Sequence, residues 1–322
     1  MSVTRPNILN NATALQKYCD GVKRLKSEFT GPTTQDLGID GPAQPVSTYD
    51  LFVIWHVNAM MTATPANGNP EGRNAAHRGP VFLPWHRFML RQLELNLQRV
   101  LGDQDFGLPY WDWAADGEGS PEDQLNSPLW RDDGLGGSGD PITTGPFVFD
   151  PNDDSSFRVR IDTDSDGNLE QVNRGLARAL GEDRAAPTLP NKTDTANALQ
   201  SGPYDASPWT VSAAGFRNMV EGWPNGPAMH NRVHVWIGGD MSPASSPNDP
   251  VFFLNHCNVD RIWEAWMQAG SNGRVYLPDQ SAPNSLKGHR INDELSSLIS
   301  APTTPADVLD STAQYVYDSL NV

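Results

Sequence analysis

The chain has 322 residues, and its 39 acidic side chains outnumber its 23 basic ones to give a formal net charge of −16. Such a surface repels nucleic acid phosphates and anionic lipids, so neither nucleic acid nor a membrane is an expected partner. Cys19 and Cys257 do not indicate a disulfide framework, and the first residues lack the pattern of a classical signal peptide. We therefore expect a protein that is cytoplasmic, or one that is exported with a partner protein.

Apolar residues recur at helical spacing in several segments, which predicts a mainly α fold. The segment 47–63 begins with an N-cap candidate, Ser47 or Thr48. The segment 83–102 has the clearest apolar stripe, and Gly102 ends it. The other predicted helices are residues 11–29, 212–223, 229–239, 255–270 and 306–320.

Between about residues 115 and 210, glycine, proline, aspartate and serine become frequent and helical spacing disappears. We interpret this segment as a long irregular excursion, with short strands near residues 157–161. Because predicted helices that carry histidines lie on both sides of it, we expect residues 1–322 to form a single domain.

One part of the excursion, residues 162–173, resembles an EF-hand calcium loop, with Asp162, Asp164 and Asp166 at the expected spacing. The twelfth position is Asn173 instead of the glutamate that binds calcium through both oxygens. No helix is predicted directly before the segment. We therefore do not expect a calcium site here.

Six of the seven histidines form two groups of three. A single buried histidine is usually bonded to a backbone carbonyl, but two trios on or near predicted helices favour a metal centre. In the second trio, the first two histidines are one helical turn apart, so their rings leave the same face of a helix. The trios are His56, His77 and His86, and His230, His234 and His256.

The ligand type limits the choice of metal. All-imidazole sets suit zinc, copper, iron or nickel, and no Glu-x-x-His pair points to a di-iron carboxylate centre. Two trios predict two ions roughly 3.5–4 Å apart, with positions left open for a small molecule. A zinc hydrolase or a structural metal protein would need one trio only, and the residues alone leave this alternative open.

The amino-acid sequence around the trios resembles that of the tyrosinase family of type-3 binuclear copper proteins. The matching stretches are "HRGPVFLPWHRFMLRQLE" for copper A, "HNRVHVWIGGDM" with "SPNDPVFFLNHCNVDRIWEAW" for copper B, and "LPYWDW". The resemblance covers about residues 10–290 and is nearest to the compact bacterial members. It implies a four-helix bundle with long irregular loops and few short strands, which holds two copper ions and uses dioxygen as co-substrate.

The same resemblance implies a function. A tyrosinase hydroxylates monophenols in the ortho position and oxidises o-diphenols to o-quinones. By position, Asn231 and the upstream Glu221 would orient a water that takes the phenol proton. The plain alternatives are a solvated helix end for Glu221 and a backbone cap for Asn231.

Two further residues follow from family position. Phe252 would pack against a ligand ring and restrict its rotation. Asp260, one turn after His256, would accept a ligand N–H or pair with Arg261 or Arg87.

Other positions depart from the family pattern or vary within it. Ala75 stands where fungal and plant members often carry a cysteine linked to a ligand histidine, so that link cannot form here. Asn255 replaces a second histidine before the last copper B ligand, and we expect it to affect substrate placement. Val235 lies where substrate preference varies, and the small residues of 241–246 favour an open site.

Three classes of function therefore compete. The first is a tyrosinase, with a catechol oxidase or an o-aminophenol oxidase without strong monophenolase activity as its close alternative. The second is a haemocyanin-like oxygen carrier, which the short segment after His289 disfavours because no shielding domain is expected there. The third is the zinc protein. Resemblance to bacterial members also allows a separate helper protein for copper loading.

Overall fold

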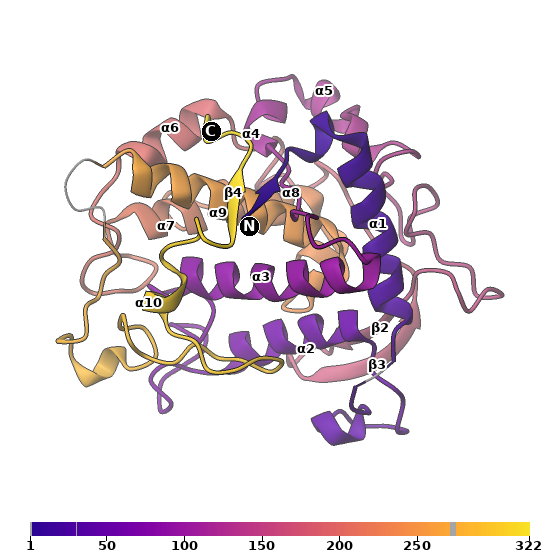
Figure 1. Cartoon of the computed structure of the whole chain (residues 1–322), viewed down its shortest axis with the longest axis horizontal. Helices are drawn as coiled ribbons and strands as arrows, with labels where there is room; N and C mark the ends of the chain where they lie inside the picture. The colour runs from indigo at the N-terminus through magenta and orange to yellow at the C-terminus, as the bar shows by residue number, and fades with distance from the viewer. Residues whose placement is uncertain (1, 30, 271–274) are drawn as a thin grey trace.

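The computed structural model describes residues 2–29, 31–270 and 275–322 and is mainly helical, as predicted (Figure 1). None of the described helices is both long and apolar enough to cross a membrane. The α helices are α1 (Ala12–Ser27), α2 (Thr48–Met61), α3 (Phe82–Leu101), α4 (Trp113–Asp116), α5 (Pro121–Leu125), α6 (Lys192–Gln200), α7 (Phe216–Glu221), α8 (Met229–Ile237), α9 (Val251–Gln268) and α10 (Pro305–Val308).

Local signals explain where the long helices begin and end. The side chain of Ser47 accepts a hydrogen bond from the Asp50 N–H and so caps α2. Gly102 ends α3 in a left-handed conformation with φ 66°, which glycine adopts without steric penalty. The prediction for α9 was four residues too short at its start. Nearly every residue of α9 is buried, so no apolar stripe marks its first turn.

The long helices pack together around the middle of the molecule. Figure 1 shows α3 lying between α2 and α9, with α1 crossing the ends of α2 and α3. α8 packs against α9 and α7. One hydrophobic core holds residues from before and after the excursion, including Trp55, Trp85, Trp236 and Trp263. Packing of this kind brings the two histidine-bearing halves of the sequence together.

Two short sheets complete the fold. β1 (Val3–Arg5) pairs in parallel with β4 (Tyr315–Tyr317), so segments from near the two ends of the chain lie side by side. The predicted helix over 306–320 was therefore wrong. Only α10 forms there, because Tyr315 and Tyr317 are buried while Val316 is 41% exposed, a two-residue alternation that suits a strand.

The excursion contains β2 (Val159–Thr163), near the residues where short strands were expected, and β3 (Leu169–Arg174), with which it forms an antiparallel hairpin. Its turn is held by Asp164, whose carboxylate accepts the backbone N–H groups of Asp166 and Asn168. The EF-hand resemblance is thus explained by an ordinary turn between strands. The prediction missed α6, which begins with a capping box between Asn191 and Asp194.

Candidate metal centre

The six histidines of the two trios converge between the long helices. Within each trio the candidate ligand atoms all lie within 4.8 Å of one another, so each trio can hold one ion. Their positions are His56 on α2, His77 on the loop before α3, His86 on α3, His230 and His234 on α8, and His256 on α9.

The loop that carries His77 is fixed by local hydrogen bonds. The side-chain oxygen of Asn74 accepts the backbone N–H groups of Ala76 at 3.1 Å and His77 at 2.7 Å. Arg78 follows with φ 63°, and its backbone N–H donates to Glu221 Oε1 at 2.6 Å. His77 therefore has a defined backbone although no helix holds it.

Backbone carbonyls orient three of the ligand rings. In each, Nδ1 lies within hydrogen-bond distance of a carbonyl oxygen, while Nε2 is buried with no hydrogen-bond partner among the described residues. A carbonyl on Nδ1 selects the tautomer whose Nε2 lone pair is free, which is the usual arrangement of a metal-bound histidine. The pairs are His56 with Ala244 (2.6 Å), His86 with Phe82 (2.7 Å) and His234 with Met241 (2.7 Å).

In the second trio, two ligand nitrogens approach each other directly. His230 Nδ1 lies 3.1 Å from Asn231 Oδ1 and 3.3 Å from the Glu221 carbonyl, so it is the protonated nitrogen. Its Nε2 lies only 3.1 Å from Nε2 of His256. A contact this short needs either a proton on one of the two nitrogens or an ion to which both lone pairs bind. These residues fit a copper ion.

Burial sets the charge state of the ligands. It lowers the pKa of all six rings, to about 3 for His56 and about 4 for His234. The rings are therefore neutral at neutral pH. A neutral imidazole is the form that binds a metal ion, so no proton has to be displaced.

The two trios touch each other. The rings of His86 and His256 stack with their centroids 4.0 Å apart and their planes at 11°. Phe252 packs between the trios, with its centroid 4.2 Å from that of His256 and 5.0 Å from that of His56. The packing of α3 on α9 thus places the two sites as neighbours, as a binuclear centre requires.

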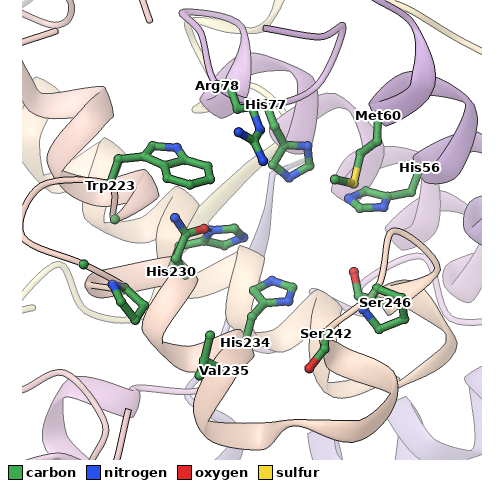
Figure 2. Close-up of a pocket in the computed structure, with 15 residues that line it drawn as sticks. His56, Met60, His77, Arg78, Trp223, His230, His234, Val235, Ser242 and Ser246 are labelled. Carbon is green, nitrogen blue, oxygen red and sulfur yellow. Dashed lines mark hydrogen bonds between the residues drawn. The ribbon is translucent and has the colours of Figure 1, made fainter. Parts of the chain in front are cut away.

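A pocket of about 510 Å³ opens onto both trios. Figure 2 shows His56, His77, His230 and His234 around this cavity. Its size falls within the usual range for small-molecule sites. The apolar part of the wall comes from Met60, Trp223, Pro227 and Val235.

Comparison with known proteins identifies the centre. The family model described as "Common central domain of tyrosinase" matches residues 46–269, which include all six histidines. The chain belongs to the tyrosinase family. The predicted family, its type-3 dicopper centre on these two trios, and the expectation of a phenol-oxidising enzyme are thereby confirmed.

Bacterial members of the tyrosinase family are similar over most of their length. A tyrosinase of Streptomyces glaucescens is 39% identical over 275 residues, which cover 84% of this chain and 89% of the relative. A grixazone synthase of Streptomyces griseus is 36% identical over 295 residues, with 84% and 90% covered.

Solved structures with lower identity share the tyrosinase fold. A polyphenol oxidase of Thermothelomyces thermophila matches with a TM-score of 0.72 at 22% identity, covering 99% of this chain and 89% of that one. A functional unit of octopus hemocyanin matches with a TM-score of 0.57 at 20% identity, covering 99% and 69%. Because this fold occurs in both, the architecture alone does not separate an oxidase from the hemocyanin.

The two residues assigned to proton transfer by the tyrosinase resemblance both contact His230. The Glu221 carbonyl and the Asn231 side chain approach the same ring nitrogen. Asn231 lines the pocket, whereas the Glu221 side chain is fully buried. Its carboxylate accepts the Arg78 N–H and, at 2.9 Å, Arg217. Burial raises the pKa of Glu221 and Arg217 opposes the rise, leaving the pKa above its usual value.

The other predicted residues lie in different surroundings. Val235 lines the pocket, as its expected role in substrate preference requires. Asn255 is fully buried and is not among the pocket-lining residues, so any effect on substrate has to pass through the neighbouring His256. Asp260 accepts from Arg87 at 2.5 Å and its hydrogen bonds do not reach a ligand imidazole. Of the two expected roles of Asp260, the geometry therefore supports the ion pair with Arg87 and not the hydrogen bond to a ligand.

Three residues near the metal centre were not predicted: Arg78 and Trp223 line the pocket, and Arg217 is buried against Glu221. Arg78 directly follows a ligand, so its proximity to the centre was readable from the sequence. Arg217 precedes Glu221 by one helical turn, which is the spacing of a side-chain pair on one helix face. Trp223 follows Glu221 closely, but nothing in its sequence context indicated that its ring lines the cavity.

Removing one ligand from either trio tests the two-site assignment. We expect two copper ions per chain in the unaltered protein and one in His56→Ala or His234→Ala, because each trio holds its own ion. Elemental analysis after dialysis measures this. His289→Gln is the control, since His289 is a buried histidine that bonds to Thr64 instead of joining a trio. A single zinc ion per chain would contradict the assignment.

Proposed function

We propose that this chain hydroxylates monophenols in the ortho position and oxidises o-diphenols to o-quinones, as a true tyrosinase. The observation that carries the proposal is the contact between two complete histidine trios at an open pocket. Asn231 on the pocket wall, next to the buried Glu221, favours monophenol hydroxylation over catechol oxidation alone.

The overall reaction balances with dioxygen as the only oxidant. One monophenol and one dioxygen give one o-quinone and one water, and two o-diphenols with one dioxygen give two o-quinones and two waters. The two copper ions, when bound, supply the electron transfer to dioxygen. The chain itself holds the ions, positions the ring and orients the acceptor of the phenol proton.

Ring binding follows from the pocket wall. Met60, Trp223, Pro227 and Val235 provide apolar contacts on which an aromatic ring can pack. The small residues Ser242 and Ser246 leave the opposite side open, as expected from the sequence of 241–246. A phenol can thus enter with its hydroxyl group directed towards the histidines.

We further propose that Glu221 and Asn231 orient a water that accepts the phenol proton. The hydroxyl of a phenol has a pKa of about 10, so roughly one molecule in a thousand is ionised at neutral pH. A carboxylate whose pKa is raised by burial is a stronger base than an exposed one. Arg217 and the Arg78 N–H hold that carboxylate in place.

Oxygen uptake by the copper-loaded protein tests the proposal. Tyrosine and catechol should both be consumed, and removal of copper with a chelator should abolish both activities. Consumption of catechol without tyrosine would assign a catechol oxidase, and consumption of 3-amino-4-hydroxybenzoate alone would assign an o-aminophenol oxidase. Reversible oxygen binding with none of the three consumed would instead indicate a carrier.

Copper loading is a separate part of the proposal. A helper protein would deliver copper through the pocket mouth, because five of the six ligands are buried. It would also accompany the chain if the protein is exported; a cytoplasmic location is the alternative. Titration of copper-free protein with copper tests whether the helper is needed. Full activity without any partner would argue against the helper.

A further inference from the structure

The pocket wall carries one permanent positive charge. Among the described residues that line the pocket, Arg78 is the only Asp, Glu, Lys or Arg. Figure 2 shows its guanidinium beside His77 and close to the Trp223 ring. The chain as a whole carries a net charge of −16, so a pocket whose only charged side chain among the described residues is a cation is a local exception.

The backbone and a neighbouring ring hold Arg78 in place. Its φ of 63° lies in the left-handed region, and its N–H is tied to Glu221. The guanidinium carbon lies 4.6 Å from the centroid of the Trp223 ring, which is a cation–π contact. The side chain is therefore directed to the pocket before any substrate binds.

The existing partner of Arg78 is weakly held. Arg78 Nη2 lies 3.0 Å from Glu71 Oε2, and Nη1 donates to the Glu71 backbone carbonyl at 2.7 Å. The Glu71 side chain is 76% exposed and that of Arg78 is 24% exposed. An ion pair at the surface contributes little, so a second carboxylate arriving from the pocket side can replace Glu71 on the guanidinium.

We propose that Arg78 is a specificity-determining residue that binds the carboxylate of acidic phenols, and that Glu71 competes with them for it. The substrate class is a phenol with a carboxylate on a side chain distant from the reacting hydroxyl. A guanidinium matches a carboxylate with two parallel hydrogen bonds, whereas a neutral or cationic side chain gains nothing from it. This inference rests on the proposed function for the identity of the ring, but not for the binding preference itself.

Equilibrium binding tests the preference without turnover. The copper-loaded protein is titrated calorimetrically with 3-phenylpropanoate and with 3-phenylpropan-1-ol, which lack a ring hydroxyl and differ in charge. We expect the acid to bind about tenfold more tightly than the alcohol. In Arg78→Gln the ratio of the two dissociation constants should fall to about one. In Arg78→Lys part of the preference should remain, because the charge is kept but the two parallel hydrogen bonds are lost.

Glu71→Gln supplies a change in the opposite direction. Because it removes the competing carboxylate, the preference for the acid should rise about two- to fivefold. A merely structural role for Arg78 would not produce opposite shifts in the two variants. An unchanged ratio in Arg78→Gln would overturn the proposal, because it would mean that the carboxylate is recognised elsewhere, for example by the metal.

The same ratio can be followed in turnover. The ratio of kcat/KM for 3-(4-hydroxyphenyl)propanoate to kcat/KM for 4-(3-hydroxypropyl)phenol should fall in Arg78→Gln and rise in Glu71→Gln. If neither phenol is oxidised but the binding preference depends on Arg78, the proposed function fails and the carboxylate site stands. If both are oxidised at the same ratio in all variants, the function stands and the site fails.

Discussion

Glu221→Gln is expected to slow the hydroxylation of monophenols by about 100-fold, while o-diphenol oxidation falls by less than about fivefold. Positioned general bases contribute typically 10²- to 10⁴-fold, and we expect the lower end because water and buffer can replace part of the function. An o-diphenol depends less on the base, since its second hydroxyl donates a hydrogen bond to the developing oxyanion. Steady-state oxygen uptake with tyrosine and with catechol measures both rates.

The matched control for this change is Asp205→Asn. Asp205 is the other carboxylate on Arg217, at 2.8 Å, and is as fully buried as Glu221. Either substitution therefore removes one of the two carboxylates that pair with Arg217. Only Glu221→Gln should alter the ratio of monophenol to diphenol rates. Equal loss of both activities in Glu221→Gln would show that the carboxylate supports the metal centre, through the Arg78 N–H next to His77, instead of the transfer of the phenol proton.

Asp260→Asn is expected to lower the free energy of unfolding by about 3 kcal/mol. Asp260 is buried on α9 and accepts from Arg87 at 2.5 Å, Tyr315 at 2.7 Å and Tyr317 at 2.5 Å. Burial alone would raise its pKa, but Arg87 and Arg5 outweigh burial and hold the pKa below its usual value. Removing one member of a buried ion pair typically costs 3–5 kcal/mol because its partner keeps an uncompensated charge.

Urea unfolding at equal copper loading measures this loss. Asp103→Asn is the control, because Asp103 pairs with Lys17 at the surface and should cost less than about 1 kcal/mol. The contribution of Asp260 has a defined pH dependence. It is present above the unfolded-state pKa of about 4 and is lost as the pH falls through the lower folded-state value. Equal losses in the two variants would contradict the importance of the buried network.

The sequence was most informative where chemistry depends on local spacing. His230 and His234, one turn apart, lie on one face of α8 as predicted. The helices could be predicted because apolar residues repeat at helical distances. The trios were indicated by the grouping of six of the seven histidines and by the family resemblance, since only His230 and His234 stand at helical spacing. The residue-specific roles of Phe252, Val235 and Asn255 stay predictions, although Phe252 does pack against His256.

Long-range pairing explains most of the failures. β4 forms because it pairs with β1 from the far end of the chain, and no local pattern in 306–320 contains that partner. The side chain of Asp260 points to this same pair of strands, so the error about β4 and the open choice for Asp260 have one cause. Arg78 was overlooked because its position relative to Trp223 depends on how two distant loops meet.

The three ligands of each copper ion come from one short segment of the chain, which limits the part of the chain that a bound ion can stabilise. Each trio closes only its own segment, residues 56–86 or residues 230–256, so a bound ion reduces the disorder of that segment alone. Neither ion ties the two halves of the sequence to each other. The distance between the two metal sites then depends on how rigidly α3 packs against α9. The stacked rings of His86 and His256 lie at that helix contact. Loosening that helix contact should leave both ions bound yet separate them enough to prevent them from working as a pair.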